Sequence, residues 1–123
     1  KGCPTGEVVI TKGHQLRFRH ILHTPGPIWR GGNSGEADLL AACYRNSLVA
    51  ASGLQVQSLA FCSISTGTYN YPLPEASQLA LITATSWLKQ NETSLTRLVF
   101  AMRGAEEHRI YNQALAEISA DHA

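Results

Sequence analysis

The residues best suited to chemistry are small hydroxyl side chains between Ser63 and Tyr71, which surround one glycine and run into tyrosines. A turn of this composition between a strand and a helix leaves successive backbone N–H groups unpaired, and such donors suit phosphate oxygens. The hydroxyls add donors, the glycine lets the backbone approach a ligand closely, and the tyrosines offer flat faces for a sugar or base. The residues concerned are Ser63, Ile64, Ser65, Thr66, Gly67, Thr68, Tyr69 and Tyr71.

On spacing alone, phosphate binding and a purely structural turn are both open for this stretch. A tight connection between a strand and a helix also uses glycine, serine and threonine, whatever its function. The common nucleotide fingerprints are absent, because the chain contains neither Gly-Lys-Ser/Thr after a glycine-rich loop nor the pattern G-x-G-x-x-G. The stretch is therefore a candidate site whose ligand has to be identified from other features.

Other polar residues give weaker patterns. None of the five histidines stands at ligand spacing from another histidine, a cysteine or a carboxylate, so no metal site is predicted. His23 closes a predicted strand and is expected to be a hydrogen-bonded structural residue. Ser63 and Ser65 lack the G-x-S-x-G elbow of serine hydrolases. Glu36 with Asp38 suits the first turn of a helix better than a pair of catalytic carboxylates.

These side chains have to be positioned by regular elements, which the pattern of apolar residues and breakers indicates. Short apolar runs predict strands, the second of which ends at Thr24-Pro25-Gly26-Pro27, and Arg30-Gly31-Gly32 is interpreted as a turn. One helix is opened by a capping box from Asn33 to Glu36, and another by Pro72. Strands are predicted near residues 8–10, 19–23, 54–62 and 95–102, and helices near 33–53, 72–88 and 105–118.

Each predicted helix has an apolar face that is expected to pack inward. From residue 33 onward helices and strands alternate, which indicates parallel strands joined by right-handed crossovers in a three-layer α/β domain. Ligands of such sheets lie beyond the carboxyl ends of the strands, which selects the loops after Cys62 and Met102. The residues expected to face inward are Leu39, Leu40, Cys43, Tyr44, Leu48 and Ala51, then Leu79, Ile82, Thr83 and Trp87, and finally Ile110, Ala114, Leu115 and Ile118.

Composition limits the classes of partner. Ten basic and nine acidic residues leave a formal net charge of +1, and no Lys/Arg run indicates nucleic-acid binding. No apolar stretch exceeds about eight residues, so neither a membrane span nor an export signal is indicated. Cys3, Cys43 and Cys62 are odd in number and far apart, which favours a reducing compartment, and Cys62 is interpreted as a small buried side chain. We expect one soluble, cytoplasmic domain over residues 1–123.

The stretch Ser63-Ile-Ser-Thr-Gly-Thr-Tyr-Asn-Tyr-Pro72 resembles the second phosphate loop of macro domains, an Ile-Ser-Thr-Gly core followed by an aromatic residue and Tyr-Pro. Residues 3–11, 20–32 and 44–48 resemble further segments of the subgroup that hydrolyses ADP-ribose esters, in the same order and spacing. The chain is thus similar, over nearly its whole length, to the carboxy-terminal two thirds of a bacterial-type macro domain. The implied fold is a three-layer α-β-α arrangement with a mixed sheet and without the family's N-terminal strands.

By this resemblance, the loop from Ser65 to Tyr69 wraps the pyrophosphate of ADP-ribose, and Tyr69 lies beside the proximal ribose. The family places an aromatic residue after the last strand, against the adenosine end of the ligand. This chain has Arg103 there, and a guanidinium plane can also stack on adenine. No catalytic residue, metal or cofactor is assigned within the chain. The implied ligand-binding residues are Ser63, Ile64, Ser65, Thr66, Gly67, Thr68, Tyr69 and Arg103.

The resemblance also implies that the family domain begins roughly 55 to 60 residues before the point that matches Lys1. That region carries an acidic residue for the adenine, an Asn-rich segment near the ribose and a Gly-rich loop whose aspartate activates water. Three functions remain open: an O-acetyl-ADP-ribose deacetylase or mono-ADP-ribosyl hydrolase, a non-catalytic ADP-ribose-binding module, and an oligomerising half-domain. Because a sheet without those strands has an unpaired edge, a companion N-terminal segment or a homo-oligomer is the expected partner, whereas nucleic acid and membrane are not.

Overall fold

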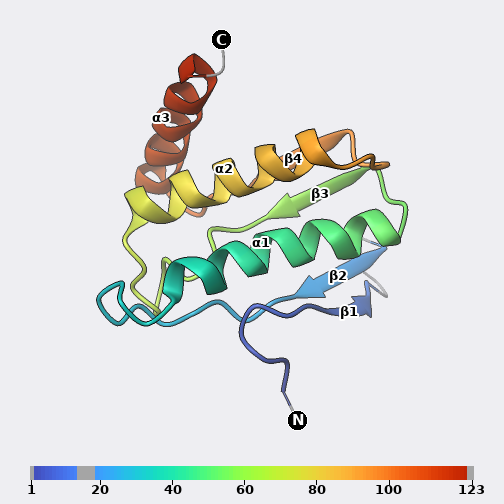
Figure 1. Cartoon of the computed structure of the whole chain (residues 1–123), viewed down its shortest axis with the longest axis horizontal. Coiled ribbons are helices and arrows are strands. Elements are labelled where there is room, and N and C mark those ends of the chain that lie inside the picture. The colour runs from blue at the N-terminus through green and yellow to red at the C-terminus, as the bar shows by residue number, and fades with distance from the viewer. Residues whose placement is uncertain (1, 14–18, 122–123) are drawn as a thin grey trace.

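The computed structural model describes residues 2–13 and 19–121 and contains the predicted elements in the predicted order (Figure 1). His14 and His122, two of the histidines considered for metal binding, lie outside the described residues. The strands are β1 (Val9–Lys12), β2 (His20–His23), β3 (Ser58–Phe61) and β4 (Arg97–Phe100), and the helices are α1 (Glu36–Gly53), α2 (Leu73–Gln90) and α3 (Ala105–Asp121).

The strands form two separate two-stranded ladders. β1 and β2 are antiparallel, with Val9 opposite His23, whereas β3 and β4 are parallel, with Ser58 opposite Arg97. α2 connects the two parallel strands, as the alternation of helices and strands predicted. The α/β class and the mixed strand directions are confirmed. In the described part of the chain, however, β2 and β3 are not hydrogen-bonded to each other, so the ladders do not join into one sheet.

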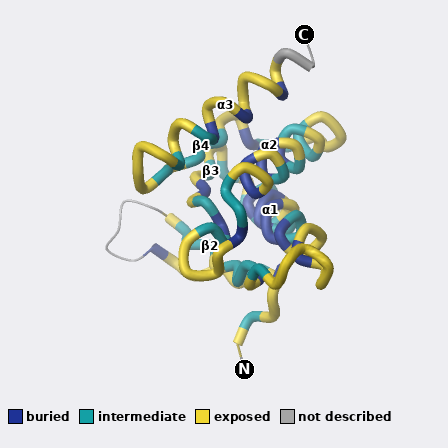
Figure 2. The backbone as a smooth tube through the Cα atoms, turned by 90° about the vertical axis from the view of Figure 1, so that its left-hand side faces the viewer, coloured by how far each residue is buried: buried dark blue, intermediate teal, exposed yellow. Residues whose placement is uncertain are grey.

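The helices supply most of the core. α1 and α2 pack side by side on one side of the strands, and α3 packs against α2 (Figures 1 and 2). α2 turns Ala76, Ala80 and Ala84 inward, and small side chains spaced four residues apart let neighbouring helices approach closely. The buried apolar residues are Leu40, Cys43, Tyr44, Leu48, Ala51, Phe61, Ile64, Tyr71, Ala76, Ala80, Leu81, Ala84, Leu95, Tyr111, Ala114 and Ile118.

An aromatic cluster lies at the carboxyl ends of β3 and β4. The rings of Phe61 and Phe100 stack with centroids 5.4 Å apart, and Tyr44 of α1 packs edge-on against Phe61 at 5.0 Å. Tyr111 of α3 lies 5.9 Å from Phe100. These rings bury large apolar areas and fix the two strand ends from which the candidate loops begin.

The predicted start of the first helix is wrong. α1 begins at Glu36, and its N-cap is Gly35, which has a left-handed φ of 79°. Asn33 lies outside the helix, and no side chain caps the helix start. The spacing from Asn33 to Glu36 matches a capping box, but the Glu36 carboxylate binds backbone groups of the preceding turn instead.

Some of the predicted inward positions are also wrong. Leu39 is 36% exposed, Ile82 is 48% exposed and Leu115 is 47% exposed, whereas Tyr111 is buried and was not predicted to be. In α2 the buried face carries Ala76, Ala80 and Ala84, and Ile82 lies outside it.

Candidate functional site

The loop from residue 62 to residue 72 joins β3 to α2, as predicted. The Tyr71 N–H donates to the Ser65 carbonyl at 2.9 Å and the Asn70 N–H to the Gly67 carbonyl at 3.0 Å, so the loop folds back on itself. Ser65 and Asn70 adopt left-handed angles, with φ of 67° and 61°, which side chains with a Cβ rarely do. Within the described residues, the N–H groups of residues 65–69 donate to no protein acceptor. The turn therefore presents a row of free backbone donors.

Hydrogen bonds tie the start of this loop to α1 and α3. The Ile64 N–H donates to the Tyr44 hydroxyl oxygen at 3.2 Å. The Ser63 hydroxyl lies 3.1 Å from the Tyr111 hydroxyl, and the Thr66 hydroxyl donates back to Ser63. Burial raises the pKa of both tyrosines, so both phenols stay protonated at neutral pH. The hydroxyls of Ser63 and Thr66 thus hold the loop together and face inward.

The other predicted residues differ in position. Ile64 is buried in the core, and the buried hydroxyl oxygen of Ser65 has no partner among the described residues. Residues 67–69 form the exposed tip of the loop. Arg103 follows β4 and is exposed, and its backbone N–H donates to the Glu107 carboxylate at 2.9 Å. The structure therefore brings the loop residues together, while Arg103 follows the neighbouring strand and lines neither of the two cavities described below.

Pro25 and Gly26, interpreted from the sequence only as a strand breaker, pack directly against the loop. A Cβ on Gly26 would lie 2.6 Å from Ile64 Cγ2 and would overlap the Ser65 hydroxyl. The Pro25 carbonyl accepts a hydrogen bond from the Gly6 N–H at 3.0 Å, which holds this segment in place. Position 26 therefore requires a residue without a side chain. A glycine between two prolines is the only local signal of this contact.

The segment around Trp29 forms the next wall of the site. The Trp29 N–H donates to the Tyr69 carbonyl at 2.9 Å, and its indole packs on the Tyr71 ring with centroids 4.7 Å apart. Gly32, with a φ of 94°, lies against the indole, because a Cβ there would be 2.9 Å from the ring. The turn and the tip of the loop are thus joined, although Trp29 and Tyr69 are 40 positions apart in the sequence.

Glu36 fixes the turn that leads into α1. Its carboxylate is 1% exposed and accepts hydrogen bonds from the N–H groups of Arg30 at 2.7 Å, Gly32 at 3.0 Å and Ser34 at 2.7 Å. Burial alone would raise the pKa of this carboxyl. The backbone donors outweigh that effect and lower the pKa to about 2, so Glu36 is ionised at neutral pH.

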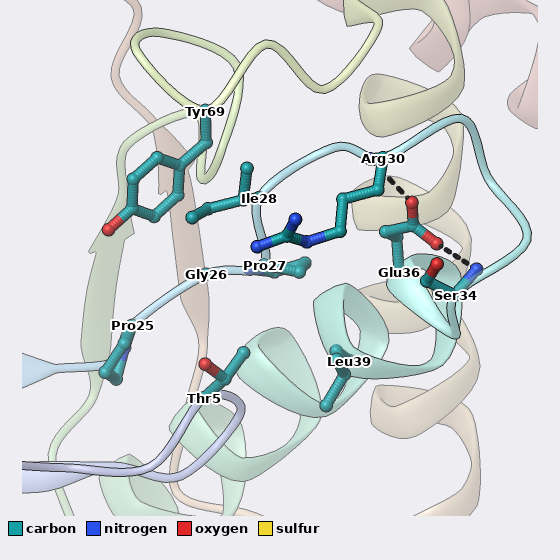
Figure 3. Close-up of a pocket in the computed structure, with 10 residues that line it drawn as sticks. All are labelled: Thr5, Pro25, Gly26, Pro27, Ile28, Arg30, Ser34, Glu36, Leu39 and Tyr69. Carbon is teal, nitrogen blue, oxygen red and sulfur yellow. Dashed lines mark hydrogen bonds between the residues drawn. The ribbon is translucent and has the colours of Figure 1, made fainter.

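A cavity of about 250 Å³ lies between these walls (Figure 3). Tyr69 closes one side of it, Thr5 and Leu39 another, and Arg30 extends its guanidinium into it (Figure 3). The buried carboxylate of Glu36 faces the turn and not the cavity, since its oxygens are bound by backbone N–H groups. The cavity thus combines an aromatic ring with an exposed cation, and Tyr69 joins it to the loop that carries the free backbone donors.

A second, larger cavity of about 1180 Å³ lies between β2 and β3. It is lined by the facing edges of both strands, and Ser58 and Ala60 of β3 are exposed there. Three buried polar atoms without a partner among the described residues belong to residues that line it: His20 Nδ1, Thr24 Oγ1 and Ser65 Oγ. Cys62, predicted to be buried, also lines this cavity and is exposed.

Among residues 2–13 and 19–121, the remaining side chains that the sequence singled out do not form a metal site. His23 Nε2 lies 2.9 Å from Thr11 Oγ1 across β1 and β2, which is the structural hydrogen bond that was predicted. In residues 2–13 and 19–121, no group of three or more His, Cys, Asp or Glu side chains is arranged to hold a metal ion. No helix in the same part of the chain is long and apolar enough to cross a membrane.

Comparison with known proteins gives one consistent result. A family model described as Macro domain matches residues 1–80. Macro domain-containing protein CT2219 of Chlorobaculum tepidum is 44% identical over 94% of this chain and 66% of its own length. The Oceanobacillus iheyensis macrodomain with ADP has a TM-score of 0.90 at 40% identity, over 98% of this chain and 63% of its own. The Trypanosoma brucei macrodomain in complex with ADP-ribose has a TM-score of 0.84 at 37% identity, over 93% of this chain and 47% of its own. This chain therefore spans less than two thirds of the length of each.

Proposed function

The chain belongs to the macro domain family, as its sequence resemblance predicted, and we propose from this premise that it recognises ADP-ribose. The observation that carries the proposal is the row of free N–H groups over residues 65–69, beside the cavity closed by Tyr69. Backbone donors of this kind bind phosphate oxygens without any basic side chain. The related macrodomain of Trypanosoma brucei was solved in complex with ADP-ribose.

The proposed pose follows from the shape of the ligand. ADP-ribose carries adenosine on one side of its diphosphate and a second ribose on the other. With the diphosphate on residues 65–69 and the adenosine toward Arg103 after β4, the second ribose lies at Tyr69 and the 250 Å³ cavity. All the predicted ligand-binding residues except Arg103 then act through the loop. Ser63, Ile64 and Thr66 shape it, and Ser65, Gly67, Thr68 and Tyr69 meet the ligand.

Binding is tested by calorimetry with ADP-ribose on the wild type and on Gly67→Ala. A Cβ at Gly67 meets no atom within 4 Å, so this variant is expected to melt at the wild-type temperature. The same methyl group blocks the approach of a phosphate to the loop, so we expect affinity to fall roughly tenfold or more. Gly53→Ala is the matched control, because position 53 is also open but lies at the end of α1. An absence of heat from the folded wild type at millimolar ADP-ribose would reject the proposal.

We further propose that the domain is of the O-acetyl-ADP-ribose deacetylase or mono-ADP-ribosyl hydrolase type, and that this chain supplies binding and not the chemical step. Glu36 is the one acidic residue in the lining of the 250 Å³ cavity, but its carboxylate is held by backbone N–H groups of the turn, and its pKa of about 2 makes it a weak general base. In the family resemblance, water is activated by an aspartate of a Gly-rich loop that the 123 residues do not include. We expect the purified chain to release no acetate from O-acetyl-ADP-ribose. Acetate release by the chain alone would reject this division of roles.

We also propose that the 1180 Å³ cavity seats an added β-strand from a companion segment. Two strand edges face the same gap, and three buried polar atoms there have no partner among the described residues. A strand inserted between β2 and β3 would pair both edges at once and would cover Ala60. The probe is the part of the Chlorobaculum tepidum relative that the match does not cover, added as a separate chain.

The companion proposal predicts a one-to-one complex in light scattering and slower amide exchange in β2 and β3. The chain without the probe is expected to be a monomer at tens of micromolar under this proposal. A stable dimer of the chain would instead indicate that a second copy fills the cavity. Unchanged amide exchange in β2 and β3 would reject the added strand.

A further inference from the structure

Arg30 carries the one exposed charge among the residues that line the 250 Å³ cavity. The other charged residue of the lining, Glu36, is 1% exposed and is occupied by three backbone donors. Among the described residues, the ion pair within 4.0 Å is Arg109 with Glu106, so Arg30 and Glu36 are not paired. Figure 3 shows the Arg30 side chain running from the turn toward Ile28 and Pro27, away from the Glu36 carboxylate.

The backbone of this arginine is held from two sides. The Arg30 N–H is bound by Glu36 at 2.7 Å, and the N–H of its neighbour Trp29 is bound by the Tyr69 carbonyl at 2.9 Å. The Trp29 indole is itself packed between Tyr71 and Gly32. The main chain of Arg30 is therefore fixed relative to the loop. This lowers the entropy lost when the Arg30 guanidinium binds a partner.

We propose that Arg30 is a specificity residue that binds a carboxylate of the molecule to which ADP-ribose is attached. This inference rests on the proposed function, in which residues 65–69 bind the diphosphate and the second ribose lies at Tyr69. A group attached to that ribose then lies in the cavity that Arg30 enters. A planar guanidinium recognises carboxylates through paired N–H donors. The substrate class is ADP-ribose linked to acidic peptide sequences, favoured over small neutral esters such as O-acetyl-ADP-ribose.

The experiment compares two conjugates by calorimetry. Both carry ADP-ribose on a peptide through a hydrolysis-resistant link, and the residues flanking the link are glutamate in one and glutamine in the other. We expect the wild type to bind the glutamate conjugate about two- to fivefold more tightly, the effect of one solvent-exposed charged contact. The preference is expected to shrink as sodium chloride is raised, because an exposed contact is screened.

In Arg30→Gln the ratio of the two dissociation constants is expected to fall close to one, and Arg30→Lys is expected to restore part of it. The ratio is read within each variant, so a change in the affinity shared by both conjugates cancels. Arg45→Ala is the charge-matched control, since Arg45 is exposed on α1 and lines neither cavity, and it is expected to keep the preference. A wild-type preference that survives in Arg30→Gln, or no preference in the wild type, overturns the inference. If the wild type binds neither the conjugates nor ADP-ribose, the proposed function itself is wrong.

Discussion

Gly26→Ala is expected to lower the free energy of unfolding by about 1–3 kcal/mol, the usual cost of overfilling a packed contact. It is also expected to weaken ADP-ribose binding by roughly tenfold or more, because the loop has to move. The new Cβ would lie 2.6 Å from Ile64 Cγ2 and would overlap the Ser65 hydroxyl. Ile64 is buried beside the aromatic cluster, so its side chain has no free space into which it could move. The clash can therefore be removed only if the backbone of residues 64 and 65 shifts. This backbone leads into the N–H groups of residues 65–69, which are proposed to bind the diphosphate.

Two further variants separate loss of fold from loss of the site. Gly53→Ala fills open space at the end of α1 and is expected to leave both stability and affinity near the wild-type values. Gly67→Ala is expected to lower affinity alone, and Gly26→Ala to lower both. Chemical denaturation and calorimetry on the same three proteins give the comparison. Wild-type affinity in Gly26→Ala would mean that the contact between Gly26 and Ser65 does not position the loop.

The place of the loop could be predicted because its signal is local. A strand, a turn of small hydroxyl residues and a proline-opened helix follow one another between β3 and α2, and each step is visible in consecutive residues. The free N–H groups of residues 65–69 follow from the same turn. The parallel pairing of β3 with β4 was predictable for a similar reason, since a helical crossover between strands leaves little choice of direction.

The contacts that hold the loop in place could not be predicted, because they join distant parts of the chain. Gly26 packs against Ser65, and the Trp29 N–H binds the Tyr69 carbonyl, although each pair is about forty positions apart in the sequence. A pattern of residues at a fixed spacing in the sequence does not predict a contact between such distant residues. The prediction that Ile82 faces inward was wrong for a related reason. Periodicity favours bulky apolar residues as the buried ones, whereas the buried face of α2 carries alanines.

The role of Glu36 could be predicted from the sequence only in part. Its three partners, Arg30, Gly32 and Ser34, are close in sequence, so the contact is local. The capping-box spacing to Asn33 nevertheless suggested a different partner. Gly31, Gly32 and Gly35 have left-handed angles that let the chain fold around the carboxylate. Several glycines directly before an acidic residue at a helix start were therefore the sequence feature that could have indicated this contact.

Glu36→Gln is therefore expected to be the most damaging change in the turn. The amide keeps one acceptor oxygen but presents an N–H₂ group to N–H donors, so at least one buried donor loses its partner. We expect the melting temperature at pH 7 to fall by roughly 5 °C or more. Trp29 and Arg30 would lose their fixed place beside Tyr69, so the cavity is expected to lose its shape in the same variant.

The pH dependence identifies the ionised carboxylate as the cause. The pKa of Glu36 falls from its ordinary value of 4.5 to about 2 on folding, so the folded state binds its proton less readily than the unfolded state. Its contribution to stability is complete above pH 4.5 and is lost as pH falls toward 2. The stability difference between wild type and Glu36→Gln is thus expected to be largest at pH 7 and to shrink below pH 4.5 in urea titrations. Asp38→Asn, an exposed change in the same helical turn, is the control for a general helix-dipole effect. A difference that stays constant down to pH 2.5 would show that the charge of Glu36 does not hold the turn.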